Sequence, residues 1–202
     1  MALSDKDRIF QNLYGLHPWN LEDNAADLAK TTATIALANP FIIETAADLT
    51  ALADTGVAAY WTSTNLKYLQ IANVAADDKS ISTDANKFAA QYNGGGFTIN
   101  GGTVPMFAYL NTGAVVENVS LTNVNITIGA TVGGIVAEMT AGTVKNNQVA
   151  GTVVKSTHAT GFAGGIAGSV TAGTISGNVV SCPVTAPTAG GIAGSVTAGA
   201  IS

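Results

Sequence analysis

A ten-residue stretch of this sequence occurs twice without change. Residues 164–173 read Gly-Gly-Ile-Ala-Gly-Ser-Val-Thr-Ala-Gly, and the same residues return at 190–199, a shift of 26. A related stretch starts at Gly133, 31 residues before Gly164, and a more divergent one spans residues 104–113. Repeat periods of about 20 to 50 residues are typical of solenoids, in which each repeat packs only against its neighbours. The sequence therefore predicts a stack of repeats.

Aligned on their glycines, these repeats place aliphatic residues in columns. The columns are Met106, Ile135, Ile166 and Ile192; Leu110, Met139, Val170 and Val196; Val115, Val144, Ile175 and Ile201; and Val124, Val153 and Val184. Short β-branched segments separated by Thr-Ala-Gly turns are typical of strands. If each repeat is one coil of a parallel β-helix, each column becomes a ladder of like residues about 4.8 Å apart. We therefore predict a mainly β fold, with about four such coils over residues 93–202.

An asparagine column accompanies the aliphatic ones. Asn118, Asn147 and Asn178 share one position in the alignment. A stacked asparagine at a turn can hydrogen-bond its neighbours and the bending backbone. We expect this column to be a structural ladder, like the column of Ile135, Ile166 and Ile192.

The repeats also carry the residues of a known family. Residues 165–168 and 191–194 read Gly-Ile-Ala-Gly, which resembles the Gly-Leu-any-Gly repeat of bacterial proteins with the GLUG motif, while residues 134–137 lack the last glycine. Residues 41–49 and 93–101 resemble the segments that precede such repeats. The resemblance implies a right-handed β-solenoid in a surface-exposed or secreted protein, often an adhesin, and it supplies no common catalytic residues.

Charges are distributed unevenly along the chain. Seventeen of the 21 charged residues precede Phe88, and only Glu117, Glu138, Lys145 and Lys155 follow it. A nearly neutral exterior of Thr, Asn, Ser and Gly suits a fibre, a coat or a surface protein. The net charge of −5 and the absence of a basic run exclude a nucleic-acid partner.

The first half of the chain predicts a different structure. Residues 1–40 read as a helical segment, with helices near 4–14 and from Asn20 onward, and form either a docked element or an assembly arm hinged at Asn39-Pro40. Residues 41–92 read as an α/β cap on the solenoid, with a helix N-capped by Thr45 and strands at 60–62 and 68–71. Residues 5–17 also resemble the N-terminus of the NADH- and FMN-binding subunit of respiratory complex I. That subunit's iron–sulfur cysteines have no counterpart in this sequence, so we predict no redox function.

Catalysis and metal binding are not expected. Polysaccharide-active β-helices need paired carboxylates or a cation with Lys or Arg on successive coils, and the repeats contain only two acidic residues. Glu138 shares the column of Ser169 and Ser195, and Glu117 that of Asn146 and Gly177, which are solvated positions. Asp77, Asp78 and Asp84 lack the spacing of a calcium loop and read as a solvated acidic segment. The single cysteine, Cys182, excludes a disulfide and a cysteine-bound metal. We expect no cofactor and no enzyme.

The end of the repeats suggests how the chain acts. Thr197, Gly199, Ile201 and Ser202 are expected to form an uncovered β edge, because the residues stop inside a coil. Either the sequence is part of a longer protein or this edge is used in assembly. We predict a non-enzymatic structural subunit that binds further copies of itself head to tail in a filament or surface layer. The alternative is a glycan- or surface-binding adhesin or phage-type fibre module.

The sequence also bears on location. No run of apolar residues reaches the ~18 to 20 needed for a membrane-spanning helix. Asp5, Lys6, Asp7 and Arg8 do not fit a cleavable signal peptide, so we expect a location on a virion, or at the cell surface by a non-classical route.

Overall fold

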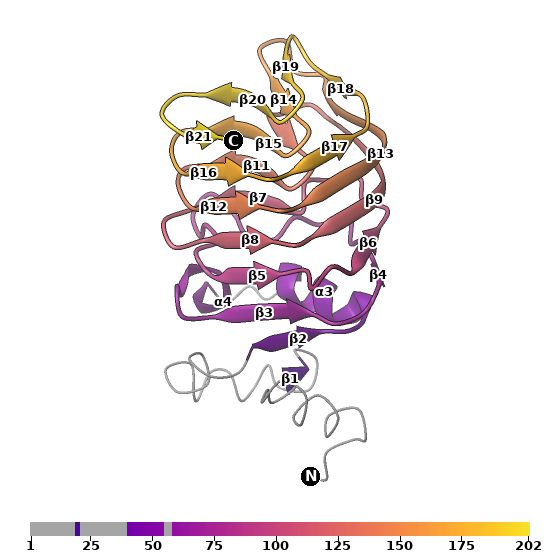
Figure 1. The fold of residues 1–202 in the computed structure, drawn as a ribbon, viewed down its shortest axis with the longest axis vertical. Coiled ribbons are helices and arrows are strands. Elements are labelled where there is room, and N and C mark those ends of the chain that lie inside the picture. The colour runs from indigo at the N-terminus through magenta and orange to yellow at the C-terminus, as the bar shows by residue number, and fades with distance from the viewer. Residues whose placement is uncertain (1–18, 21–39, 55–57) are drawn as a thin grey trace.

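The chain folds into a right-handed parallel β-solenoid of about six turns (Figure 1). The structure is a computed structural model that describes residues 19–20, 40–54 and 58–202. Strands on the near face of Figure 1 run from left to right while the chain climbs from bottom to top, which makes the coil right-handed. The predicted fold class is confirmed, with about six turns instead of about four.

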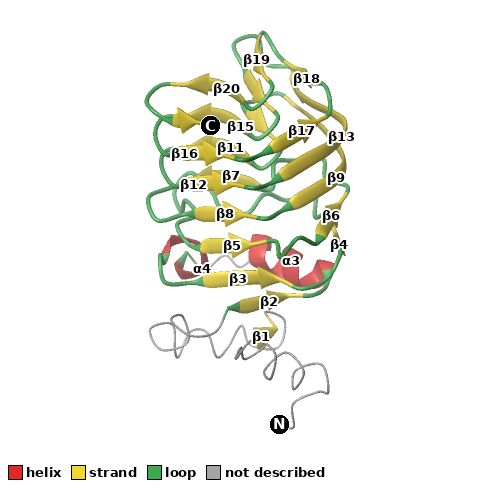
Figure 2. Ribbon diagram, in the orientation of Figure 1, coloured by secondary structure: helices red, strands yellow, loops and turns green. Residues whose placement is uncertain are grey.

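Four parallel sheets form the walls of the solenoid (Figure 2). Sheet A contains β1 (Trp19–Asn20), β2 (Phe41–Ile43), β3 (Lys67–Gln70), β5 (Gln91–Asn93), β8 (Val115–Glu117), β12 (Thr143–Lys145), β16 (Thr174–Ser176) and β21 (Ala200–Ile201). Sheet B contains β4 (Val74–Ala75), β6 (Thr98–Asn100), β9 (Ser120–Ile128), β13 (Gln148–Ser156), β17 (Val179–Ser181) and β18 (Val184–Thr185). Sheet C contains β7 (Phe107–Leu110), β11 (Val136–Met139), β15 (Ala167–Val170) and β20 (Ala193–Val196). Sheet D contains β10 (Val132–Gly133), β14 (Phe162–Gly164) and β19 (Thr188–Gly190). In the later turns the chain visits A, B, D and C in that order.

The first turn uses helices in place of strands. Helix α3 (Ala46–Asp54) is N-capped as predicted, because the Asp48 amide donates to Thr45 Oγ1 and the Thr45 amide donates to Asp48 Oδ2. Strands β2, β3 and β5 continue sheet A without a break into β8, so residues 41–92 are themselves coils of the solenoid.

The predicted strand at residues 60–62 is wrong, since helix α4 (Ala59–Thr62) occupies that segment. Tyr60 and Trp61 are both buried, and the Trp61 indole donates to Leu52 O at 2.9 Å. Two consecutive side chains cannot both enter the core from one strand, whereas they can from a helical turn. The strand predicted at 68–71 corresponds to β3.

Most of the segment 1–40 lies outside the described residues, including the helix predicted at 4–14, the resemblance at 5–17 and the hinge at Asn39. The exception is β1, where Trp19 and Asn20 pair in parallel with Phe41 and Ile42. The helix predicted from Asn20 onward falls on residues 21–39, which also lie outside the described residues.

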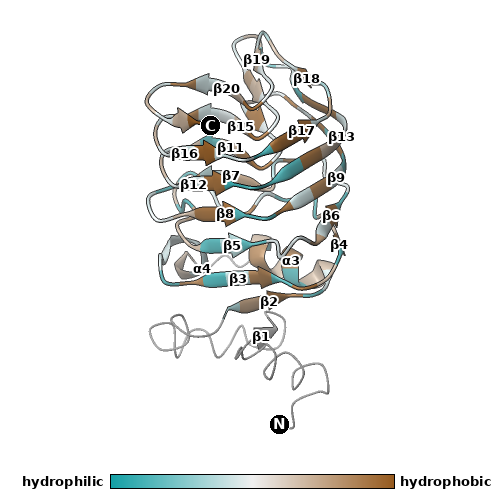
Figure 3. Cartoon of the chain, in the orientation of Figure 1, coloured by the Kyte–Doolittle hydropathy of each residue, from teal (hydrophilic) through white to brown (hydrophobic). Residues whose placement is uncertain are grey.

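The aliphatic columns stack in the core, but two of the predicted columns contain wrong residues. Val116, not Val115, aligns with Val144 and Ile175, because the turn before β8 has one residue more than the turn before β12. A strand's side chains alternate between faces, so that single residue decides which valine is inside. Figure 3 shows the apolar segment recurring in β8, β12 and β16.

The second correction lies in sheet B. Val154 pairs with Ile126 below and Val184 above, whereas Val124 pairs with Gly151 and Val153 pairs with Asn125. Bulges in the β9–β13 pairing shift the register there, and glycine-based alignment cannot detect them.

Aromatic rings fill the lower core. Phe41, Tyr68, Phe88 and Phe107 follow one another with ring centroids 5.4, 6.1 and 4.7 Å apart. The Tyr68 hydroxyl donates to Tyr60 O at 2.8 Å. Burial raises the pKa of Tyr68 well above its ordinary value.

We expect the free energy of unfolding to decrease at alkaline pH. Burial also raises the pKa of Tyr92, so both phenols keep their protons in the folded chain, whereas in the unfolded chain they ionise near pH ~10. The folded state then binds more protons above pH ~10, so stability falls as pH rises through that value. Urea unfolding between pH 8 and 11 measures this slope, and Tyr92→Phe is expected to flatten it. An equal slope in the Phe variant would contradict the assignment.

Candidate functional site

The predicted edge residues lie on the last coil, at the end of the solenoid farthest from β1 (Figure 1). The amide of Thr197 donates to Val170 O at 2.9 Å and that of Ser202 to Ile175 O at 3.0 Å. Gly199 lies in the turn between them. Within the described residues, β17, β19, β20 and β21 each have a strand neighbour on one side only. The last coil is thus joined to the coil below it and presents an open edge on its other side.

The apolar core reaches the surface at this edge. Val196 continues the column of Leu110, Met139 and Val170, which are at most 1% exposed, yet Val196 itself is 42% exposed. Ile201 ends the sheet A column in the same way and is 44% exposed. Exposed apolar area next to an open β edge is the surface that a further strand layer would cover.

A hollow of about 380 Å³ opens beside these columns. It is lined by Val180, Cys182, Val184, Ala189, Gly190, Gly191 and Ile192. Cys182, the only cysteine of the chain, is partly buried there, and this burial raises the pKa of its thiol. The thiol therefore reports on whether the hollow is covered. Sequence reasoning missed this hollow, since its walls come from segments about ten residues apart that only the coil brings together.

Two of the three predicted asparagines form a ladder. Asn147 is 1% exposed, and its side-chain amide donates to Asn178 Oδ1 at 3.0 Å and to Val116 O at 3.1 Å. Its oxygen accepts the Val119 amide at 2.9 Å. Asn147 and Asn178 therefore connect the turns between sheets A and B of successive coils.

Asn118 stands one residue outside that ladder, for the same reason as Val115. It lies opposite Asn146, which lies opposite Gly177, and these three residues share a left-handed backbone with φ of 56° to 61°. Asparagine and glycine tolerate this conformation best. The second predicted column, Ile135, Ile166 and Ile192, stacks directly through backbone hydrogen bonds of 2.9 to 3.0 Å.

The two glutamates of the repeats lie on different walls. Glu117 pairs with Lys145, not with Asn146, and accepts hydrogen bonds from Lys145 Nζ and Asn93 Nδ2 at 3.0 Å each. Glu138 shares its column with Ser169 and Ser195 as expected. Because one carboxylate is on sheet A and the other on sheet C, they do not face each other across a site.

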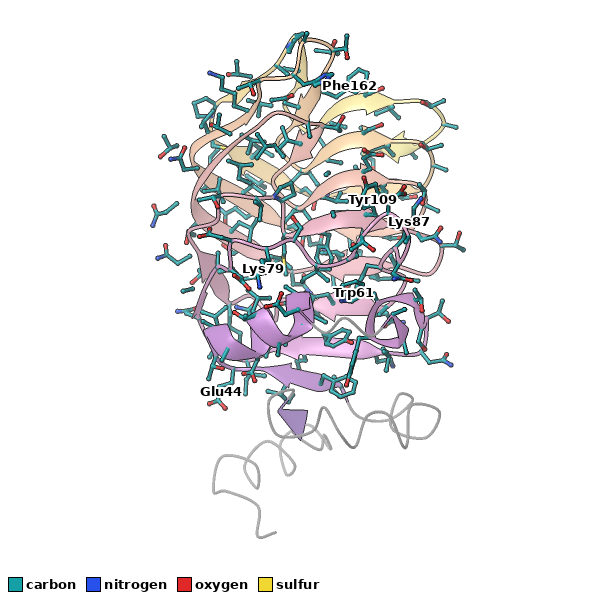
Figure 4. All side chains as sticks on the ribbon, turned by 180° about the vertical axis from the view of Figure 1, so that it is seen from behind. Glu44, Trp61, Lys79, Lys87, Tyr109 and Phe162 are labelled. Carbon is teal, nitrogen blue, oxygen red and sulfur yellow. The ribbon has the colours of Figure 1, made fainter. Side chains whose placement is uncertain are left out.

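A small charged and aromatic cluster lies on the outer face of sheet C (Figure 4). Tyr109 pairs with Glu138 of the next coil, and Lys87 Nζ lies 5.6 Å from the Tyr109 ring centroid and 3.0 Å from Asp84 Oδ1. Burial, and then the nearby Glu138 and Asp84 carboxylates, raise the pKa of Tyr109. Sequence reasoning did not bring these residues together, because Lys87 comes from a loop that precedes sheet C.

The acidic segment is partly paired. Thr103 Oγ1 donates to Asp78 Oδ1 at 2.6 Å, and Lys79 contacts Asp54. Across the described part of the chain, no group of three His, Cys, Asp or Glu side chains is placed to hold a metal ion. Among the same residues, no helix has the length and apolarity to cross a membrane.

Comparison with protein-family models, with curated proteins and with solved structures finds no match to this chain.

Proposed function

We propose that this protein is a non-enzymatic structural β-solenoid that assembles end to end through the edge of its last coil. The observation that carries the proposal is the exposure of Val196 and Ile201, the residues in which two buried core columns end. Covering them would remove apolar area from water at roughly 25 cal/mol per Å². The same step would give hydrogen-bond partners to the open strand edge.

The outer walls of the repeats support a structural role. They carry four charges over residues 88–202, two of which pair with each other as Lys145 and Glu117. Such a surface repels neighbouring subunits weakly. It suits a filament or layer at a cell surface or on a virion.

Charging the edge is expected to stop assembly. Val196→Lys with Ile201→Lys places two ammonium groups where the core columns end, and their half-exposed positions let both reach water without unfolding the coil. The matched control is Val179→Lys, the same substitution at an exposed valine of β17 that lies outside the core columns. Light scattering and negative-stain microscopy across concentrations should show assemblies for the parent chain and the control, and monomers for the double variant.

Two results would contradict the proposal. One is a parent chain that stays monomeric at every concentration. The other is a double variant that assembles as readily as the Val179→Lys control.

A second candidate function is glycan binding by the Tyr109 cluster. Among the described residues, no hydrogen bond holds the Glu138 carboxylate or the Tyr109 hydroxyl, so both groups are available to a ligand. An aromatic ring beside a carboxylate and the Lys87 ammonium offers a stacking surface together with polar partners for sugar hydroxyls.

If this cluster binds a glycan, Tyr109→Ala and Glu138→Gln should each weaken binding by about tenfold, the loss expected for ~1.4 kcal/mol of contact. Ser195→Ala, two coils above Glu138 in the same outer column, is the control and should bind normally. A glycan array followed by titration calorimetry measures both effects. An array without hits excludes this candidate and leaves the structural proposal intact.

A further inference from the structure

The charged and aromatic cluster on sheet C lies where the lower edge of that sheet is interrupted (Figure 4). Strand β7 is the lowest strand of sheet C, and the coil below it makes only isolated bridges, from Ile81 to Phe107 and from Phe88 to Leu110. Six residues separate the two lower bridge residues, whereas two separate their partners in β7. The longer segment, residues 82–87, therefore leaves the wall as a loop.

Ser82 ties this loop to Tyr109. Its backbone has a φ of 76°, and among the described residues every other one with a left-handed backbone is an asparagine or a glycine. That conformation costs free energy in a serine, so the contacts around it must hold it in place. The hydroxyl of the buried Ser82 side chain donates to Tyr109 O at 2.9 Å and accepts the Tyr109 amide at 3.1 Å. The loop and Tyr109 therefore form one fixed unit.

Opposite charges offset each other within the loop. Lys87 Nζ lies 3.0 Å from Asp84 Oδ1 and 5.6 Å from the Tyr109 ring centroid. Lys87 reaches the ring from the coil below, because the next residue, Phe88, is bridged to Leu110. The lysine is thus neutralised before any ligand arrives.

Glu138 adds a further negative charge to the cluster. It lies opposite Tyr109 on the coil above, and within the described part of the chain no hydrogen bond or ion pair holds its carboxylate. The charged groups that act on the Tyr109 hydroxyl are Glu138, Asp84 and Lys87, two anions and one cation. The cluster therefore carries one uncompensated negative charge beside an aromatic ring.

This combination distinguishes between classes of sugar. The ring offers a stacking surface to the apolar face of a pyranose, whatever charge the sugar carries. A protonated amine on that sugar can also donate a charge-assisted hydrogen bond to Glu138, and the negative face of the ring attracts it. A carboxylate or sulfate on the sugar would instead meet Glu138 as a like charge.

We propose that the cluster of Tyr109, Glu138, Lys87 and Asp84 binds glycans through a protonated amino sugar. The pyranose ring stacks on Tyr109 at the side that faces the coil above, and its ammonium group pairs with the Glu138 carboxylate. This inference rests on the second candidate function, glycan binding, and adds to it the charge class of the sugar.

The test compares two oligosaccharides that differ only in the substituent on nitrogen. They are the linear tetramer of glucosamine and its fully N-acetylated counterpart, each titrated into the full chain at pH ~5.5, where amines are protonated and carboxylates ionised. We expect the tetramer with free amines to bind about tenfold more tightly, the size of effect expected for one charge-assisted hydrogen bond. This preference should shrink at high salt, because ions screen a partly exposed charge pair.

Variants with the same change in net charge make the test specific. Glu138→Gln should abolish the preference for the free amine. Glu117→Gln removes a carboxylate from sheet A, where Glu117 pairs with Lys145, and should leave the preference unchanged. Lys87→Met leaves Asp84 without its cation and should strengthen the preference. Circular dichroism verifies that each variant folds.

The outcomes separate this inference from glycan binding itself. Equal affinity for the two tetramers, or a preference that Glu117→Gln reduces as much as Glu138→Gln does, overturns the inference and leaves the second candidate function standing. A glycan array that yields only neutral or acidic sugars has the same meaning. An array without hits removes the second candidate function and this inference with it.

Discussion

Gly165→Val is expected to lower the free energy of unfolding by about 3 kcal/mol or more, whereas Gly191→Val leaves it within about 0.5 kcal/mol. A Cβ on Gly165 would lie 2.4 Å from both the Gly191 carbonyl oxygen and Val180 Cγ1, so the coil above must shift and lose its hydrogen bonds. At Gly191 a Cβ meets no atom within 4 Å. Urea unfolding of the two variants measures the difference.

This comparison isolates the coil-to-coil contact, because both glycines occupy the same place in identical decapeptides. Differences in intrinsic propensity between glycine and valine cancel between the two sites. Equal destabilisation at both positions would show that the local backbone, and not the neighbouring coil, requires glycine.

Asn147→Leu is expected to lower the free energy of unfolding by about 3 to 5 kcal/mol. The substitution keeps the branched shape of the side chain but removes the hydrogen bonds that Asn147 makes to the Val119 amide and the Val116 carbonyl, both at the corner between sheets A and B. Each buried polar group left without a partner costs about 1 to 3 kcal/mol. Thermal and urea unfolding measure the loss.

The control is the adjacent residue. Asn146→Gly should be nearly neutral, because Asn146 has a φ of 56° and lies opposite Gly177, which already holds that backbone conformation in the next coil. A loss at Asn146 as large as that at Asn147 would mean that the corner depends on the turn as a whole, and not on the Asn147 hydrogen bonds.

The resemblance to GLUG-motif proteins stays a prediction, but the structure explains why such a motif would need its last glycine. A Cβ on Gly168 would lie 2.7 Å from the Val132 amide, and one on Gly194 would lie 2.7 Å from the Ala163 amide. The sheet D strand of one coil therefore packs directly against sheet C of the next. In β11, the residue opposite Gly168 is Ala137.

Periodicity in the sequence was sufficient for the fold class. Residues 164–173 and 190–199 are identical, and in stacked coils each residue of one copy has the same kind of neighbours as its counterpart in the other. Sequence reasoning also identified the Thr45 cap and the ladder of Ile135, Ile166 and Ile192. It failed for Tyr60 and Trp61, where aromatic residues indicated a strand and tertiary packing around Leu52 stabilised a helical turn instead.

Register and site were decided by the tertiary structure. One extra residue in the turn before β8 places Val116 and not Val115 in the core, because strand side chains alternate between faces. The same extra residue shifts the partners of Glu117 and Asn118 by one position. The Tyr109 cluster and the hollow beside Cys182 each join residues from different segments, and contacts between such segments have no local signature in a single sequence. The amino-acid sequence thus determined that this chain stacks, through the spacing of its glycines and β-branched residues. Only the folded coil determined what its last layer offers to a partner, because that surface arises from contacts between coils.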